Sequence, residues 1–483
     1  MTQQATVFNR RRGGVLLHIT SLPSGNIGAD AYRFVDFLHQ AGMTVWQMLP
    51  LGPTHGDNSP YQCLSAHAAN SDLICIETLK SQDWANFDDE DTDRKILLAQ
   101  AFGQFETNAS AMQKQTFSTF CQQQAYWLAD YVLFCQIRES YQYSAWFDWP
   151  ELLRDRDVAT LEAFKSRHQQ ALRIKCFEQF QFFEQWQSLK QYANSKGVLL
   201  FGDMPIFVAH DSADVWANKL LFTLDSSGQA TKVAGVPPDY FSETGQRWGN
   251  PLYDWAKHEQ QDYLWWQQRL KTQLDLFDLI RIDHFRGFEA CWEIPASCET
   301  AIDGQWVKAP GEALFDKLTS VFGELPLVAE DLGIITDEVT ALREKYGMPG
   351  MKILQFAFGG DATNPYLPHQ HQQDSVAYTG THDNDTTLGW YEALDQNSKD
   401  HLATYVGDSN ETMPWVLNRM ALQSVAQLAV IPMQDILALD GSHRMNVPGT
   451  TEDNWSWSFS WDNVEQGSAE RLQQLNQLYG RSE

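Results

Sequence analysis

Eight short apolar runs spread along the 483-residue chain constrain its fold most strongly. Most of them close on a polar residue or a turn, and stretches of helical character separate most of them. This alternation of strands and helices is typical of a parallel (β/α)8 barrel, the TIM barrel of the α/β class. The runs are G-V-L-L-H (14–18), V-W-Q-M-L-P (45–50), G-V-L-L-F-G-D (197–203), L-I-R-I-D (279–283), L-P-L-V-A-E-D (325–331), M-K-I-L-Q-F (351–356), S-V-A-Y-T-G-T-H-D (375–383) and L-A-V-I-P-M-Q-D (428–435).

Two connections between these runs are too long for a simple strand–helix unit. Within the first, Leu128, Tyr131, Val132 and Cys135 follow the i, i+3, i+4, i+7 spacing of an amphipathic helix. A typical barrel needs about 250 residues, which leaves about 230 of this chain for additions. We therefore expect a single barrel over 1–483, with large, mostly helical insertions at 51–196 and 204–278 around the C-terminal face of the barrel.

The charge balance excludes strongly anionic partners. The 35 basic and 62 acidic residues give a formal net charge of −27, which repels phosphate backbones and anionic lipid. We therefore expect no nucleic acid and no membrane among the partners, and no run of 18 apolar residues offers a membrane span. The N-terminus lacks the apolar stretch of a signal peptide, and the seven cysteines form no C-x-x-C pair. These features predict a cytoplasmic protein with reduced thiols.

Four carboxylates fall at the C-terminal ends of predicted strands, where barrel enzymes carry their chemistry. They are Asp203, Asp283, Glu330 and Asp383. Carboxylates that share a pocket raise each other's pKa, because like charges disfavour ionising together. Such an arrangement suits glycosidic chemistry, in which one carboxylate attacks and another stays protonated as the acid.

Two basic residues accompany these acids. Side chains alternate along a strand, so Arg281 and Asp283 point the same way, and the cation would keep that carboxylate ionised and oriented. The alternative interpretation is a structural ion pair in the core. His382 directly precedes Asp383, and both reach one site only if the chain bends, which Gly380 permits.

The blocks that carry these residues resemble a known family. R-I-D-H-F-R-G, V-A-E-D-L-G and T-G-T-H-D-N-D-T are similar to the active-site blocks of amylomaltases, the 4-α-glucanotransferases or disproportionating enzymes of glycoside hydrolase family 77 in the α-amylase clan. The resemblance runs from near the N-terminus to about Trp457, and the 235–255 block is the most specific to the family. The other blocks are G-V-L-L-H-I-T-S-L-P-S (14–24), S-P-Y-Q (59–62), G-D-M-P-I-F-V-A (202–209), G-V-P-P-D-Y-F-S-E-T-G-Q-R-W-G-N-P-L-Y-D-W (235–255) and R-M-N-V-P-G-T (444–450).

The resemblance implies a role for each matched residue. Asp283 corresponds to the nucleophile that forms a covalent glucosyl-enzyme, Glu330 to the general acid/base, and Asp383 to the carboxylate that holds sugar hydroxyls. Arg281 and His382 correspond to supporting residues. The positions expected to contact sugar are Ser59, Tyr61, Asp203 and Asn446 in the donor subsites, and Asp239, Tyr240, Phe241 and Trp248 in a substrate-covering loop within 235–255.

The resemblance also implies the reaction. Segments of α-1,4-glucan are expected to move between maltooligosaccharides or amylose, as donor and acceptor, by a retaining double displacement with a covalent glucosyl-Asp intermediate. No cofactor and no metal are expected, and the sequence carries no signal for the oligomeric state.

The residues themselves leave three other interpretations open. An α-1,4-glucan hydrolase of the same clan would use the same acids. A non-catalytic glucan-binding protein is the second alternative. The third is a metal-dependent barrel enzyme, because Asp203, Asp283, Glu330 and His382 are also donors for a divalent cation; Arg281 among them would repel such a cation.

Overall fold

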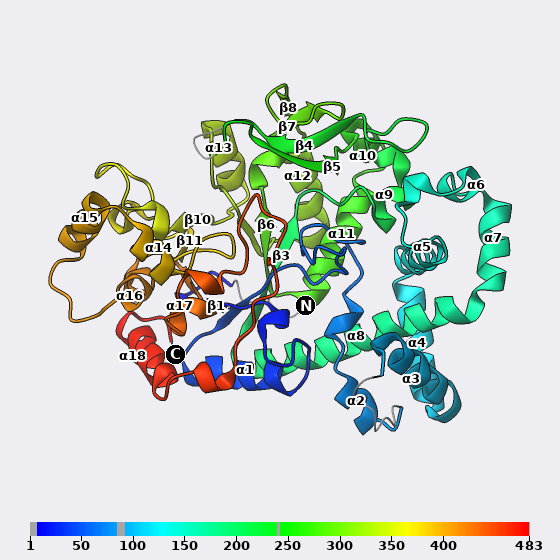
Figure 1. Cartoon of the computed structure of the whole chain (residues 1–483), viewed down its shortest axis with the longest axis horizontal. Helices are drawn as coiled ribbons and strands as arrows, with labels where there is room; N and C mark the ends of the chain where they lie inside the picture. The colour runs from blue at the N-terminus through cyan, green and yellow to red at the C-terminus, as the bar shows by residue number, and fades with distance from the viewer. Residues whose placement is uncertain (1–6, 85–91, 239–241, 483) are drawn as a thin grey trace.

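The centre of the molecule is an eight-stranded parallel sheet, and each of the eight predicted runs overlaps one of its strands (Figure 1). The computed structural model describes residues 7–84, 92–238 and 242–482. The strands are β1 (Arg12–Leu16), β2 (Val45–Gln47), β3 (Leu199–Pro205), β6 (Leu279–Asp283), β9 (Leu327–Ala329), β10 (Gly350–Ile353), β11 (Ser375–Tyr378) and β12 (Leu428–Pro432).

The sheet curls into a nearly closed barrel, which confirms the predicted fold class. Hydrogen bonds join the strands side by side in the order β10-β11-β12-β1-β2-β3-β6-β9, so the chain travels round the barrel in sequence order. The remaining seam is bridged where the N–H of Ala329 donates to the carbonyl oxygen of Pro349, just before β10, at 2.9 Å. The carboxyl ends of all eight strands therefore share one rim. Each strand contributes at least one buried side chain to a shared apolar cluster, which includes Leu16, Val45, Phe201, Leu279, Val328, Met351, Val376 and Leu428.

Helices cover the outside of the barrel. In α1, residues Ala31, Phe34, Val35 and Leu38 recur at helical spacing and are buried against β2 and α8. Among the described residues, no helix is long and apolar enough to cross a membrane. The helices are α1 (Ala29–Gln40), α2 (Ile76–Ser81), α3 (Arg94–Asn108), α4 (Ala111–Gln123), α5 (Leu128–Ser140), α6 (Glu151–Arg154), α7 (Val158–Arg167), α8 (Gln169–Ser195), α9 (Ala213–Ala217), α10 (Trp255–Gln260), α11 (Leu264–Leu276), α12 (Gly311–Phe322), α13 (Asp337–Lys345), α14 (Thr387–Ala393), α15 (Gln396–Val406), α16 (Trp415–Gln423), α17 (Met433–Ile436) and α18 (Ser468–Leu478).

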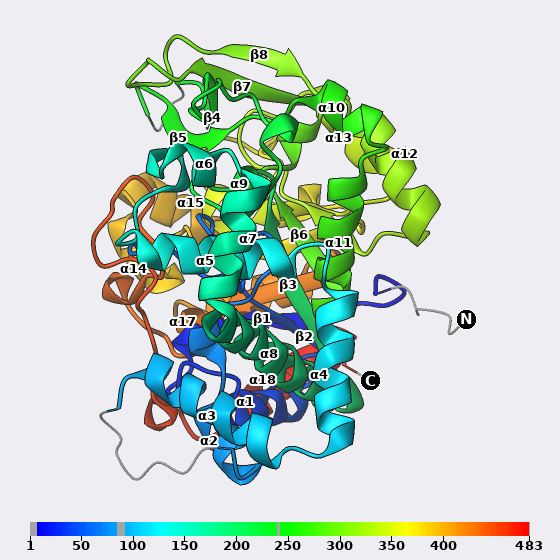
Figure 2. The same cartoon turned by 90° about the vertical axis from the view of Figure 1, so that its right-hand side faces the viewer.

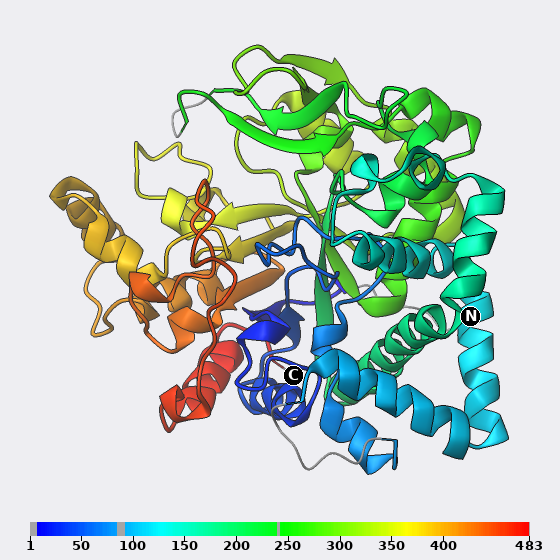
Figure 3. The ribbon, with the colours of Figure 1, turned by 45° about the vertical axis from the view of Figure 1, so that its right-hand side comes forward.

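The connection between β2 and β3 contains α2 to α8. The spacing of Leu128, Tyr131 and Val132 correctly predicted α5, in which all three are buried. The long helix α8 contacts α1, α11 and β3, so it belongs to the layer around the barrel. Figure 3 shows the cyan helices of this connection on the opposite side of the barrel from the orange and red helices near the C-terminus.

A second, antiparallel sheet lies at one end of the molecule (Figure 2). β4 (Lys232–Val236) pairs with β5 (Gln246–Pro251) and β7 (Ala290–Pro295), and β8 (Gln305–Lys308) completes the order β5-β4-β7-β8. The sequence analysis did not anticipate this sheet, because its strands come from two connections separated by β6 and pair over long range. The division into subdomains at 51–196 and 204–278 stays a prediction.

Candidate active site

The four predicted acids gather at the C-terminal rim of the barrel. Asp203 lies in β3, Asp283 ends β6, and Glu330 directly follows β9. β3 and β6 are neighbours, with Asp203 opposite Arg281 in the register. Asp383 follows β11 in a turn. Acids that are distant in the chain thus share one edge of the barrel.

Arg281 holds two of these acids. Its Nη1 donates to Asp203 Oδ2 at 2.6 Å, and its Nη2 donates to Asp283 Oδ1 at 2.9 Å. The side chains of Arg281 and Asp203 are buried, whereas that of Asp283 is 30% exposed. Burial alone would lower the pKa of Arg281, but the carboxylates of Asp203 and Asp283 raise it well above its usual value. A permanent cation therefore orients Asp283 and leaves part of its carboxylate open to the rim.

Glu330 lies in a different environment. Its Oε2 accepts the backbone N–H of His284 at 2.7 Å, and its Oε1 accepts the N–H of Leu332 at 3.2 Å. Burial raises the pKa of Glu330 to about 8, with the charges of Asp283 and Asp331 adding to that effect and Arg281 opposing it. This raised pKa favours the protonated form of Glu330 at neutral pH. His284 directly follows Asp283, and its backbone is left-handed (φ 52°). The peptide group between Asp283 and His284 therefore supplies the N–H that Glu330 accepts.

Tyr61 extends the site from the loop after β2. Its hydroxyl donates to Asp203 Oδ2 at 2.8 Å, and its ring stacks on His382 with centroids 5.2 Å apart and planes at 16°. The Trp455 ring packs against both rings, with its centroid 5.8 Å from that of Tyr61 and 6.0 Å from that of His382. Burial raises the pKa of Asp203, and Arg281 opposes this. Asp203 therefore anchors Tyr61 and Arg281 from inside the rim.

Asp383 is held on the other side of the rim. β11 ends at Tyr378, and the turn that follows brings His382 Nε2 to 3.4 Å from Asp383 Oδ1. The bend expected near Gly380 is therefore present. Asn446 Nδ2 donates to the same Oδ1 at 2.6 Å. The Asp383 side chain remains 48% exposed, so it is fixed in place yet open to a ligand.

The other predicted sugar contacts fall into three groups. The indole ring of Trp248 meets the ring of His284 edge-on, with centroids 4.8 Å apart, so it lies beside Asp283 and Glu330. Ser59 lies in the Tyr61 loop, where its N–H donates to Asp57; among the described residues, no hydrogen bond joins its side chain to the acids. Asp239, Tyr240 and Phe241 lie outside the described residues.

The structure adds three residues that the sequence analysis did not single out. His284 supplies an N–H to Glu330, Arg444 Nη2 donates to the Asp383 carbonyl oxygen at 2.9 Å, and Trp455 supports Tyr61. Two of them stand in the quoted blocks R-I-D-H-F-R-G and R-M-N-V-P-G-T. Their presence there was the available signal, but a backbone donor and a loop that folds back leave no pattern of their own.

The described residues offer no cluster of side chains for the metal-dependent alternative. In the described ranges, no group of three or more His, Cys, Asp or Glu side chains is arranged to hold a metal ion. The guanidinium of Arg281 lies between Asp203 and Asp283 and pairs with both carboxylates. Its positive charge therefore takes the place that a metal ion would occupy between them.

Comparison with known proteins shows the family to which the chain belongs. The model of the family described as 4-alpha-glucanotransferase, glycoside hydrolase family 77, matches residues 17–463. The 4-alpha-glucanotransferase of Thermus thermophilus is 48% identical over 92% of this chain and 94% of its own length, and that of Synechocystis sp. is 44% identical over 98% and 99%. The amylomaltase of Streptococcus agalactiae, solved in complex with acarbose, superposes with a TM-score of 0.94 at 35% identity, covering 98% of this chain and 100% of that one. The chain belongs to the 4-alpha-glucanotransferases of glycoside hydrolase family 77.

Proposed function

We propose that this enzyme moves segments of α-1,4-glucan between maltodextrins through a covalent glucosyl-Asp283 intermediate. The observation that carries the proposal is the contrast between two acids joined through His284. Burial raises the pKa of Glu330 to about 8, whereas Asp283 is partly open and accepts a hydrogen bond from Arg281. Two carboxyl groups in such different environments suit the roles of acid and nucleophile.

In the first step, Glu330 donates its proton to the glycosidic oxygen while an oxygen of Asp283 attacks the anomeric carbon. The bond from that carbon to the glycosidic oxygen breaks, the bond to Asp283 forms, and the leaving chain departs with a new hydroxyl group. The hydrogen bond from Arg281 to Asp283 orients that carboxylate for this attack.

In the second step, the 4-hydroxyl of an acceptor glucan attacks the same carbon. The bond to Asp283 breaks, and the Glu330 carboxylate takes the hydroxyl proton, which restores both acids. Two inversions retain the α-configuration. Transfer exceeds hydrolysis if acceptor sugars and the covering loop keep water from the intermediate.

The surrounding residues would position the donor. Asp383, fixed by Asn446 and His382, is placed to accept hydrogen bonds from sugar hydroxyls. The rings of Tyr61 and Trp248 offer faces on which sugar C–H groups pack. The S. agalactiae relative bound acarbose, and we propose that this chain takes the same class of α-glucan ligand. We propose that the block 235–255 covers the bound glucan.

Product analysis after incubation with maltotriose tests the proposal. Transfer predicts glucose and longer oligomers together, with a constant total of reducing ends. A steady rise in reducing ends would instead favour the hydrolase. An Asp283→Asn variant that disproportionates maltotriose at the parental rate would refute the assignment of the nucleophile.

A further inference from the structure

The apolar run L-A-V-I-P-M-Q-D (428–435) ends on a buried acid that the proposed mechanism does not use. Asp435 lies in the short helix α17, directly after β12. Its side chain is only 1% exposed, so it lies out of reach of a bound glucan. Burial raises the pKa of Asp435, and hydrogen bonds from two threonines oppose that rise. A buried carboxylate is costly unless such bonds compensate it, so the partners of Asp435 indicate what it does.

The hydrogen bonds of Asp435 join the two ends of one loop. This segment, residues 379–387, is the Asp383 loop, and it runs from the residue after β11 to the first residue of α14. At its start, Thr379 Oγ1 donates to Asp435 Oδ2 at 2.6 Å. At its end, Thr387 Oγ1 donates to the same oxygen at 2.6 Å, and the Thr387 N–H donates to Oδ1 at 2.7 Å. Both threonines are fully buried, so the two ends of the loop are fixed to one carboxylate.

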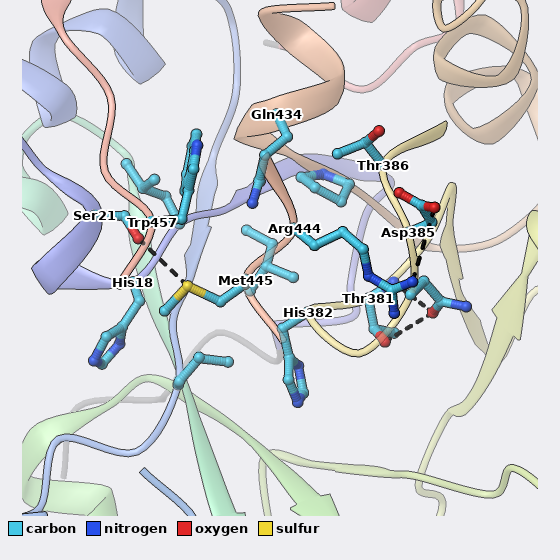
Figure 4. Close-up of a pocket in the computed structure, with 15 residues that line it drawn as sticks. His18, Ser21, Thr381, His382, Asp385, Thr386, Gln434, Arg444, Met445 and Trp457 are labelled. Carbon is cyan, nitrogen blue, oxygen red and sulfur yellow. Dashed lines mark hydrogen bonds and ion pairs between the residues drawn. The ribbon is translucent and has the colours of Figure 1, made fainter. Parts of the chain in front are cut away.

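The middle of the Asp383 loop carries His382 and Asp383. In Figure 4, His382 lines the same narrow cavity as Gln434, which directly precedes Asp435. The Asp383 side chain is 48% exposed, so packing does little to hold it. Its 2.6 Å hydrogen bond from Asn446 comes from a separate segment of the chain. That bond therefore forms only while the Asp383 loop stays in place.

The helix layer around the barrel holds Asp435 itself. Asn418 in α16 is fully buried, and its Nδ2 donates to the Asp435 carbonyl oxygen at 3.1 Å. Helix α16 also packs against β12 and α17. The carboxylate is therefore fixed by regular structure, which suits it to anchor a loop.

We propose that Asp435 is a positioning residue for Asp383: by holding both ends of the Asp383 loop, it keeps the Asp383 carboxylate where it meets Asn446 and a sugar hydroxyl. This inference rests on the proposed function, because that function assigns Asp383 to the bound glucan. Asp435 touches neither the substrate nor the reacting atoms, so its effect on the reaction passes through Asp383.

Two substitutions at Asp435 test the anchor. Asp435→Leu removes all three hydrogen bonds to the loop, and kcat/KM for maltotriose should fall about 10²-fold, because a small displacement of a group at the reacting sugar is costly. Asp435→Asn still accepts the Thr387 N–H, and its amide can donate to both threonine hydroxyls, so kcat/KM should stay close to the parental value. Equal losses in the two variants would overturn the proposal.

A double-mutant cycle with Asn446→Leu separates positioning from packing. Asn446→Leu alone should reduce kcat/KM about tenfold, because it removes one hydrogen bond to Asp383. In the Asp435→Leu background the same substitution should change kcat/KM little, because Asp383 has already left Asn446. A further tenfold loss there would show that the loop had not moved and would overturn the proposal. Where Asp435→Leu does not fold, Thr379→Val removes only the bond at the β11 end and serves in the same cycle, with the same two outcomes.

Asp278 provides a matched control at the opposite end of the barrel. It directly precedes β6, and its Oδ2 accepts the Leu200 N–H at 2.8 Å and a hydrogen bond from Asn194 Nδ2 at 2.9 Å. It therefore ties chain segments together as Asp435 does, but at the amino ends of the strands. Asp278→Leu should lower the melting temperature and leave kcat/KM nearly unchanged. Equal losses of kcat/KM in Asp278→Leu and Asp435→Leu would indicate general destabilisation and reject the proposal.

The maltotriose assay also separates this inference from the proposed function. If the parent does not elongate maltotriose, the proposed function fails, and this inference fails with it. If the parent elongates maltotriose while the losses of Asp435→Leu and Asn446→Leu multiply in the double variant, only the role of Asp435 fails.

Discussion

Replacing Arg281 by methionine tests how the site holds its acids. The variant keeps a long side chain but leaves Asp203 ionised and buried, with the Tyr61 hydroxyl still donating to it. Removing one partner of a buried ion pair costs about 3–5 kcal/mol. Unfolding entropy is about 2.1 cal/mol/K per residue, or about 1 kcal/mol/K for 483 residues. The melting temperature should therefore fall by about 3–5 °C.

The loss of stability should also depend on pH. Without the guanidinium, the folded-state pKa of Asp203, already raised by burial, rises further above its unfolded value near ~4. The folded state then holds the proton more tightly than the unfolded state, so stability is retained at low pH and lost as pH rises through that window. The slope is at most about 1.4 kcal/mol per pH unit. The deficit of Arg281→Met should be smaller at pH 5 than at pH 8.

Differential scanning calorimetry of the parent and three variants at both pH values checks this reasoning. Adding Asp203→Asn to Arg281→Met removes the stranded charge and should restore most of the lost stability. The control is Arg173→Met, which breaks a half-exposed pair with Glu106 (3.0 Å) and should cost about 0–1 kcal/mol. A deficit that is equal at both pH values and unchanged by Asp203→Asn would refute a buried charge as the cause.

Three further substitutions probe Glu330, Asp383 and the Tyr61 contact of Asp203. Glu330→Gln should lower kcat for transfer by about 10²–10⁴-fold and abolish the loss of activity expected of the parent as pH rises through about 8. Asn446→Leu removes the donor 2.6 Å from Asp383 and should reduce kcat/KM about tenfold with little change in melting temperature. Tyr61→Phe leaves Asp203 short of a donor and should cost about 1–3 kcal/mol, measured by calorimetry.

Each of these expectations has a contrary result. Because the folded-state pKa of Glu330 is raised, its contribution to protein stability should be lost as pH rises from the unfolded-state pKa toward 8. A Glu330→Gln variant with the parental pH–stability curve would contradict that shift. Parental kinetics in Asn446→Leu would show that Asp383 needs no fixed orientation. A Tyr61→Phe protein as stable as the parent would mean that water replaces the hydroxyl at Asp203.

The barrel and its acidic rim were predictable because both leave local signals. Parallel barrel strands are buried on both faces and read as apolar runs, as in β12, where all of Leu428–Pro432 is buried. Carboxylates at the ends of such runs must share one rim, because the strands are parallel. The alternation of side chains placed Arg281 and Asp283 on one face, and their 2.9 Å hydrogen bond confirms this contact.

Contacts made by loops were not predictable in the same way. Tyr61 and Asp203 are 142 residues apart, and Asn446 and Asp383 are 63 apart, and no periodicity in the loops encodes either pairing. The hydrogen bond from His284 to Glu330 comes from the backbone, so its side chain gave no clue. For these loop residues only the family resemblance pointed to the site, and it named Tyr61 and Asn446 but not Trp455.

The most direct test of the account is to trap the intermediate. A fluorinated α-glucosyl fluoride, which forms the glucosyl-enzyme faster than it is released, should label the protein once, and mass spectrometry of the digest should place the sugar on Asp283. A label on Glu330 or Asp383, or transfer without any labelled carboxylate, would contradict the claim that Asp283 attacks while Glu330 supplies the proton.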